Sequence, residues 1–285
     1  MKQNYTHIEV IVDQSGSMLN RKTDVIGGFN NFIKEQQQLN GECTVSLTLF
    51  SDKYHRVYSM KPLKSVSELT ARTYKPGGNT ALLYTMIQVI DGLGAELGAM
   101  EEHQRPDRVV VVTITDGEEN HSYTHEPSLL TNGDFTRHQV FNGLAAGSSN
   151  SYMQLTSPPS LIDPQPGTAI NNHPPSTLQL NPIPLYDSTQ LLRRIKEQSE
   201  VYSWTFVYLG ANHDAFAAGS TMGYSMSNTL NYAASAKGFH DAFASTSSNL
   251  REVRTSSRDA YLTKSKAFFV DADQQVQNAN LAATT

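Results

Sequence analysis

The stretch "VIVDQSGSMLNR", residues 10–21, ends an apolar run on Asp13 and follows it at once with Ser15 and Ser17. A short run of β-branched residues bounded by turn residues predicts a buried strand that stops at Asp13. Asp and Ser are common in turns and as helix caps, so a strand, a turn and a cap account for the stretch. The same three side chains all carry oxygen atoms, so one side of a metal site accounts for it as well. The rest of the chain has to decide between the two.

Other segments repeat the pattern of a buried strand followed by an amphipathic helix. Strands are predicted at 7–13, 44–51, 108–116 and 203–211, with a weaker edge strand at 55–60 beside the second. Helices are predicted at 22–39, 80–97 and 188–200, followed by a short helix at 213–222, an edge strand near 226–232 and a helix at 236–257. Strands that alternate with helices predict an α/β fold, with a doubly wound, mostly parallel central sheet flanked by helices.

The composition excludes several classes of protein. The net charge of −5 over 285 residues gives no reason to expect nucleic acid or an anionic membrane as a partner. The single cysteine, Cys43, cannot form an internal disulfide and is expected to be a small buried side chain in a reducing compartment. We find no signal-peptide pattern and no apolar stretch long enough to span a membrane, so a cytoplasmic protein is expected.

A change of composition interrupts the pattern between about 124 and 187. Nine of the twelve prolines lie there, with no lysine and only Arg137 as an arginine. Prolines at this density exclude a helix, and the stretch is too long for an ordinary connection. We therefore predict a domain at 1–235 with an insertion at 124–187, followed by a C-terminal helix and a frayed tail at 236–285.

The insertion leaves the strand end that carries Asp116 and is therefore expected on the face that binds the ligand. Our hypothesis is that it sets partner choice. In one variant it inhibits the site itself, with Asp134, Asp163 or Glu126 at the metal. A tolerated surface insertion is the alternative.

Further oxygen donors follow the other predicted elements. Asp116 ends the strand in "TITDGEEN" (113–120), and "KPGGNTALL" (75–83) places Thr80 at a predicted helix start. The carboxyl ends of parallel strands meet at one edge of a sheet, where open α/β folds bind ligands. Hydroxyl and carboxylate oxygens without Cys or His suit a hard cation, Mg²⁺ or Mn²⁺, with Ca²⁺ as a further possibility. The candidate metal ligands are Asp13, Ser15, Ser17, Thr80 and Asp116.

The three motifs "DQSGS" (13–17), "GGNT" (77–80) and "TDG" (115–117) resemble, in this order, the metal-ion-dependent adhesion site of the von Willebrand factor A domain family. The resemblance covers roughly residues 5–123 and 187–235 and is of the bacterial or phage type. It implies that Ser15 and Ser17 bind the metal directly, that Thr80 binds directly or through water, and that Asp13 and Asp116 act mostly through waters. It also implies a cation with an open position that attracts a partner's Asp or Glu carboxylate, which means protein binding without turnover.

Two other functions remain open at this stage. A Mg²⁺-dependent phosphohydrolase would use Asp13 as its nucleophile, but such enzymes carry a second acid two residues later, where this chain has Ser15. A structural or virion-associated protein would use the domain only as a scaffold. His121 and His125 have the four-residue spacing of part of a zinc site, but the surrounding prolines and glycine argue against the helix that this spacing requires.

Overall fold

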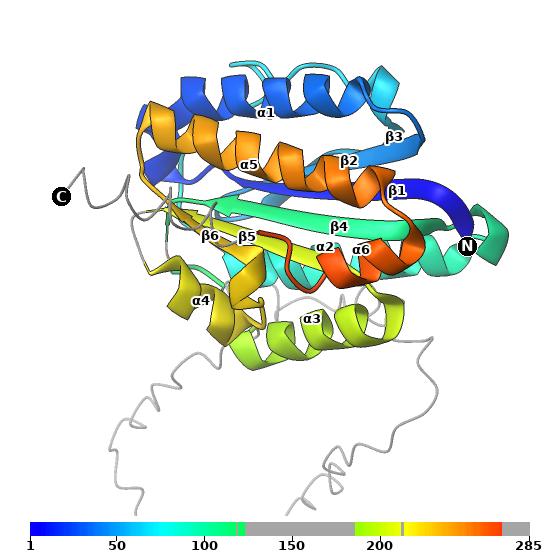
Figure 1. Ribbon diagram of the computed structural model, residues 1–285. Coiled ribbons are helices and arrows are strands. Elements are labelled where there is room, and N and C mark those ends of the chain that lie inside the picture. Colours follow the sequence, from blue (N-terminus) through cyan, green and yellow to red (C-terminus); the bar gives the residue numbers. More distant parts are fainter. Residues whose placement is uncertain (118, 123–185, 212–213, 270–285) are drawn as a thin grey trace, which may run out of the picture. The chain divides into compact units, whose positions relative to one another are not determined.

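The apolar run that ends at Asp13 forms strand β1, Lys2–Asp13, in the middle of the sheet (Figure 1). The computed structural model describes residues 1–117, 119–122, 186–211 and 214–269. Most residues of β1 from Tyr5 on are buried because helices cover both sides of the strand. Ile8, Val10 and Val12 point into one apolar core and Ile11 into another. The near-continuous apolar pattern of the sequence is the result of this burial on both faces.

The described residues form a six-stranded sheet with the order β3-β2-β1-β4-β5-β6. Its other strands are β2 (Glu42–Phe50), β3 (Tyr54–Pro62), β4 (Pro106–Thr115), β5 (Thr205–Ala211) and β6 (Thr229–Tyr232). Neighbouring strands are parallel except β3, which is antiparallel to β2. The predicted doubly wound α/β fold is therefore confirmed, including the weak edge strand that became β3.

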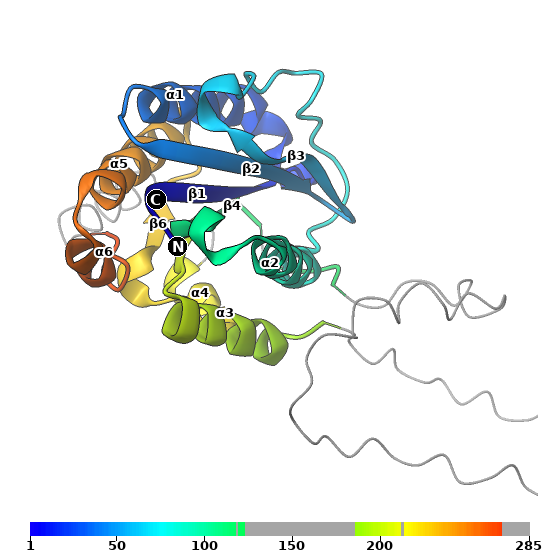
Figure 2. The same cartoon turned by 90° about the vertical axis from the view of Figure 1, so that its right-hand side faces the viewer.

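Helices lie on both faces of the sheet (Figures 1 and 2). One face is covered by α1 (Lys22–Gln37) and α5 (Ala236–Thr255), and the other by α2 (Leu82–Ala99), α3 (Ser188–Tyr202) and α4 (Ala215–Met222). The remaining helical pieces are α6 (Arg258–Lys264) and the 3-10 turns η1 (Gly16–Arg21), η2 (Leu63–Ser65), η3 (Glu102–Gln104) and η5 (Met226–Asn228). None of the helices in the described part of the chain is both long and apolar enough to cross a membrane.

Several helix ends differ from the predicted ones. Helix α2 begins at Leu82, so Thr80 precedes the helix instead of starting it. Helix α3 is capped by Asp187, whose carboxylate accepts a hydrogen bond from the amide of Gln190, and it ends at Tyr202, two residues beyond the predicted end. The helix predicted at 236–257 ends at Thr255, and α6 starts anew after the cap Ser257. Each difference reflects a capping hydrogen bond or a tertiary contact that hydrophobic periodicity does not report.

Helix α5 packs as part of the same core as the strands before it. Phe239, Phe243 and Leu250 are buried among the side chains of β1, β2 and α1. The buried guanidinium of Arg108 on β4 donates to the carbonyl oxygens of Arg254 at 2.8 Å and Ser256 at 2.6 Å, which fixes the end of α5. The described residues on both sides of the gap at 123–185 belong to one compact unit, in which this helix is included.

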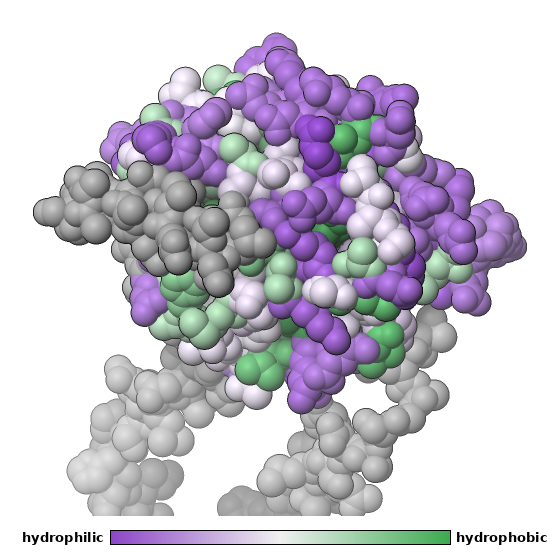
Figure 3. Space-filling view, viewed as in Figure 1, coloured by the Kyte–Doolittle hydropathy of each residue, from purple (hydrophilic) through white to green (hydrophobic). Residues whose placement is uncertain are grey.

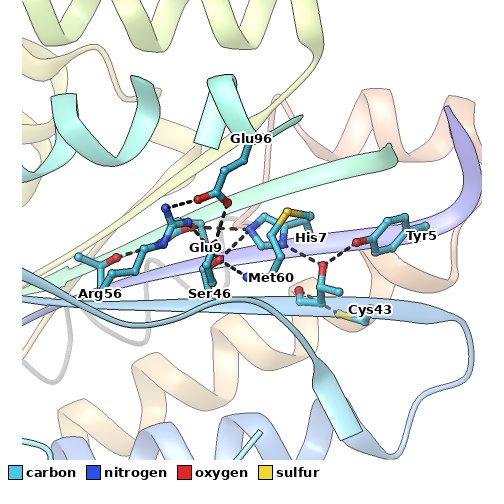
Figure 4. Close-up of polar contacts among 11 residues, drawn as sticks. Tyr5, His7, Glu9, Cys43, Ser46, Arg56, Met60 and Glu96 are labelled. Atoms are coloured by element: carbon cyan, nitrogen blue, oxygen red, sulfur yellow. Dashed lines mark hydrogen bonds and ion pairs between the residues drawn. The ribbon is translucent and has the colours of Figure 1, made fainter. Parts of the chain in front are cut away.

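A charged network runs from a buried acid in the sheet to the partly exposed side of α2 (Figure 4). Glu9 on β1 is fully buried and pairs with Arg56 of β3, with Oε2 and Nη2 2.9 Å apart. Arg56 also donates through Nη1 to Glu96 of α2 at 3.0 Å. Thr48 donates to the other oxygen of Glu9 at 3.2 Å. This network binds an edge strand, a central strand and a helix together, and its buried acid has a cationic partner.

Hydrophilic residues cover much of the face seen in Figure 3, and apolar residues show as small separate patches. Cys43 is buried, as expected, and burial raises the pKa of its thiol to about 11. The predicted insertion, with Asp134, Asp163 and Glu126, lies outside the described residues apart from its last two positions, and so does the predicted tail from residue 270 on.

Candidate metal centre

The candidate ligands come together at the carboxyl edge of the sheet because β1 and β4 are adjacent parallel strands. Asp13 is the last residue of β1, and Asp116 follows the last residue of β4. Ser17 donates a hydrogen bond to Oδ1 of Asp116 at 2.5 Å, which joins the first motif to the third. The hydroxyl oxygens of Ser15 and Ser17 are 3.0 Å apart. The amide of Ser15 donates to Asp13, so four of the five predicted residues are connected by direct contacts.

The fifth residue, Thr80, reaches the same place from the loop before α2. A Cβ atom on Gly117 would lie 3.2 Å from Thr80 Oγ1, 3.5 Å from Ser17 Oγ and 3.7 Å from Asp13 Oδ2. Oxygen atoms from three separate segments thus surround a small space that a side chain at residue 117 would fill. The sequence analysis did not select Gly117, although its place directly after Asp116 is a signal for it. This space between the oxygen atoms, here called the cradle, is where a cation would bind.

The loops of the cradle are held by backbone contacts. The amide of Gly16 donates to the carbonyl of Gly78 at 2.9 Å, and the amide of Gly77 donates to the carbonyl of Gln14 at 2.8 Å. Gly78 has a φ of +84°, and a Cβ there would meet Oδ2 of Asp52 at 2.1 Å. The positive φ favours glycine at 78, and a Cβ there would also displace the carboxylate of Asp52. The "GG" of the second motif serves to place Thr80 against the end of β1.

Asp13 is fully buried and oriented by two hydrogen bonds. Oδ1 accepts from the amide of Ser15 at 2.7 Å, and Oδ2 accepts from the hydroxyl of Thr115 at 2.6 Å. Its backbone carbonyl accepts from the buried phenol of Tyr74 at 2.6 Å. The sequence analysis selected neither Thr115 nor Tyr74 as a candidate site residue. Thr115 could have been noticed because it faces the same edge, directly before Asp116.

The electrostatics of the centre favour a cation. Burial raises the pKa of Asp13 to about 6, hydrogen bonds from Thr115 and Ser15 oppose this rise, and the nearby charge of Asp116 adds to it. Within the described residues Asp13 has no ion pair with a lysine, arginine or histidine. A buried carboxylate without a cationic partner is costly when ionised, and a divalent ion removes that cost.

Among the described residues, the candidate ligands differ in exposure to solvent. Asp13, Ser15, Thr80 and Asp116 are buried, whereas Ser17 is exposed. No three His, Cys, Asp or Glu side chains gather to hold a metal anywhere in the described ranges. A metal at this place would therefore depend on hydroxyl oxygens in addition to the two carboxylates, a donor set that suits Mg²⁺ or Mn²⁺.

His121 belongs to a separate contact at the rim. Its Nε2 lies 3.5 Å from Oδ1 of Asp52, which also accepts from the side-chain amide of Asn79 at 2.8 Å. Glu119, which the sequence places near the two histidines, contacts the start of α2. His125, the other half of the suggested zinc pair, lies outside the described residues.

Comparisons with known proteins identify the fold. No family model and no curated protein matches the sequence. The pilus adhesin SpaC from Lactobacillus rhamnosus GG, in an open conformation, matches with a TM-score of 0.50 and 18% identity over 88% of this chain and 31% of that chain. The vWF domain of the type V pili tip protein Mfa5 from Porphyromonas gingivalis matches with a TM-score of 0.49 and 12% identity, over 88% and 97% of the two chains.

A third match is the proximal thread matrix protein 1 from the mussel byssus, in a form with a zinc-occupied MIDAS motif. It has a TM-score of 0.44 and 11% identity, over 87% of this chain and 46% of that chain. This chain thus spans less than half the length of the mussel protein and of SpaC. The fold of the described residues is the von Willebrand factor A fold.

Proposed function

We propose that this protein is a divalent-cation-dependent protein-binding domain and not an enzyme. The observation that carries the proposal is the cradle beside Gly117, where hydroxyl and carboxylate oxygens from Asp13, Ser17 and Thr80 face one space. The bound Mg²⁺ or Mn²⁺ would supply a positive charge with an open coordination position. Ser15, Ser17 and Thr80 would hold the ion, while Asp13 and Asp116 orient the hydroxyl groups and bound waters.

The partner is expected to present an Asp or Glu carboxylate. Hydroxyl oxygens are neutral ligands, so the ion would keep much of its charge and attract an anionic ligand from outside. The exposed side of the centre is the side of Ser17, and Leu19 on the same turn η1 is 60% exposed. An acidic side chain flanked by an apolar residue would match this edge. We further propose that the insertion at 124–187 influences which partner binds.

The geometry of Asp13 supports a binding role over phosphohydrolase chemistry. A nucleophilic carboxylate needs an oxygen that can reach a phosphorus atom. Both oxygens of Asp13 accept short hydrogen bonds, and the side chain has no exposed surface. The scaffold alternative is disfavoured because a scaffold has no need for a buried carboxylate without a cationic partner. A cytoplasmic location stays a prediction.

Calorimetric titration with Mn²⁺ tests the metal site. Wild type, Ser17→Ala and Ser220→Ala are compared, the last being a matched control because Ser220 is an exposed serine on α4. Ser17→Ala should weaken Mn²⁺ binding by about tenfold or more, as expected for a lost ligand, while Ser220→Ala should bind like wild type. Absence of Mn²⁺ binding by the wild type would end the proposal.

The open position is tested with the Mn²⁺-loaded protein and short peptides. Water-proton relaxation reports the water molecules that exchange at the bound Mn²⁺. A glutamate-containing peptide should displace water from the Mn²⁺ and lower the enhancement of the water-proton relaxation rate. The same peptide with glutamine in place of glutamate should not. Equal effects of the two peptides would argue against recognition of a carboxylate.

A further inference from the structure

Helix α2 starts without a cap of its own. The cap position is Ala81, which has no side-chain acceptor, and the first turn contains no acidic residue. The first amide groups of an α-helix have no acceptor within the helix and must find one elsewhere. This matters for the metal centre because Thr80 stands immediately before the cap position.

The missing acceptors come from the loop that follows β4. Glu119 Oε2 accepts from the amide of Leu83 at 2.7 Å, and Ser122 Oγ accepts from the amide of Tyr84 at 2.9 Å. Glu119 is itself held by the amides of His121 and Ser122, both 2.7 Å from Oε1. A carboxylate at this end of a helix is also favoured by the helix dipole.

The same loop holds the backbone of Thr80. Oδ1 of Asn120 accepts from the amide of Thr80 at 2.9 Å, and the amide of Asn120 donates to the carbonyl of Thr80 at 3.1 Å. Asn120 follows Asp116 by four residues, so it links the second and third motifs of the metal centre. One residue thereby fixes both backbone groups of a predicted metal ligand.

We propose that Glu119, Asn120 and Ser122 form a clasp that positions Thr80 opposite Asp116 and so sets the affinity of the centre for its cation. This inference rests on the proposed metal-binding function. The three are positioning residues. Asn120 contacts the backbone of Thr80, and Glu119 and Ser122 contact the start of α2 and each other, so we expect all three to act through Thr80. A Ser or Asp at residue 81 would cap α2 equally well, but it would not tie the helix to the end of β4.

A double-mutant cycle separates positioning from general stabilisation. Mn²⁺ affinity is measured for wild type, Asn120→Ala, Thr80→Ala and the double variant. Asn120→Ala should weaken binding by roughly tenfold in the wild-type background, the lower end for residues that orient ligands. In the Thr80→Ala background it should have less than about a twofold effect, because the residue on which it acts is gone.

Two further variants support the cycle. Asn79→Ala is the matched control, because the side-chain amide of Asn79 adjoins Thr80 but contacts Asp52 and the ring of His121 instead of the backbone of Thr80. It should leave Mn²⁺ affinity within about twofold of wild type. Glu119→Gln should give a smaller loss than Asn120→Ala that also vanishes in the Thr80→Ala background, which keeps the test usable if Asn120→Ala folds poorly.

The outcomes distinguish this inference from the function on which it rests. If the wild type binds no Mn²⁺, both are overturned. If the wild type binds Mn²⁺ and Asn120→Ala binds equally well, the clasp alone is overturned. Equal losses in both backgrounds would also overturn it, because the effect would then not pass through Thr80.

Discussion

Glu9 and Asp13 lie on the same side of strand β1, both fully buried, yet their surroundings differ in charge. Glu9 faces the guanidinium of Arg56 at 2.9 Å, and Figure 4 shows how Arg56 continues the network to Glu96. Asp13 faces hydroxyl and amide donors and has Asp116 close by, with no ion pair among the described residues. The chain supplies the cation for the first acid. We infer that the second acid receives its cation from solution.

The largest expected effect comes from removing the internal cation. Arg56→Met would leave Glu9 ionised in a buried site, and breaking one side of such a pair costs about 3 kcal/mol of unfolding free energy. Urea unfolding at neutral pH measures this. The double variant Glu9→Gln with Arg56→Met should recover much of the loss because no lone charge remains. If the single and double variants were equally unstable, packing and not charge would explain the network.

Removing the carboxylate of Asp13 should raise, not lower, the free energy of unfolding of the metal-free protein. The pKa of Asp13 is raised from 3.8 to about 6, so the stability that the group contributes falls as pH rises through this window and is lowest above pH 6. The side chain of Asn in Asp13→Asn carries no charge. The free energy of unfolding of this variant at pH 7.5 should therefore be roughly 2 kcal/mol higher than that of the wild type. The difference in the free energy of unfolding between the two proteins should fall towards zero near pH 4.

Unfolding of both proteins in the presence of a chelator checks this prediction. Added Mn²⁺ should stabilise the wild type and leave Asp13→Asn nearly unchanged, because only the wild type would bind the ion. If Asp13→Asn were less stable than wild type at pH 7.5 without metal, the cost assigned to the buried carboxylate would be wrong.

A smaller effect is expected when the space between the oxygen atoms is filled. Gly117→Ala places a methyl group 3.2 Å from the hydroxyl oxygen of Thr80 and should weaken Mn²⁺ binding by about tenfold, or ~1.4 kcal/mol. The metal-free stability should change little, since residue 117 is only partly buried. Gly77→Ala is the control, because a Cβ there meets no atom within 4 Å. Unaltered Mn²⁺ affinity in Gly117→Ala would contradict the location of the ion.

The smallest expected effect concerns the exposed residue Leu19 beside the candidate metal centre. Leu19→Ser should leave Mn²⁺ affinity unchanged and weaken binding of a peptide with glutamate next to an apolar residue by about threefold, as expected for a rim contact. Val201→Ser serves as the control, because Val201 is 66% exposed and lies at the end of α3. Fluorescence anisotropy of the labelled peptide measures its binding to each of the two variants. An equal loss in the control would remove Leu19 from the binding edge.

The ends of β1 and β4 and the candidate metal ligands that stand there were predicted from local patterns. Asp13 and Asp116 were predicted because each ends an apolar run, and adjacent parallel strands bring such ends together. Thr80 was predicted to start a helix, but α2 starts two residues later, at Leu82. The backbone of Thr80 is instead bound by Asn120. Gly117 and Thr115 were noted only as parts of the third motif. Their own roles were not predicted, because those roles depend on distances across the edge of the sheet.

The sequence alone determined where strands end and which oxygen-bearing side chains stand at those ends, because burial on both faces and turn chemistry are local properties. Only the tertiary structure decided which buried acid is neutralised from within. Arg56 reaches Glu9 across β2 through an antiparallel edge strand, and Glu119 reaches Leu83 across 36 residues. Such partners are set by the packing of distant segments, which no local pattern encodes.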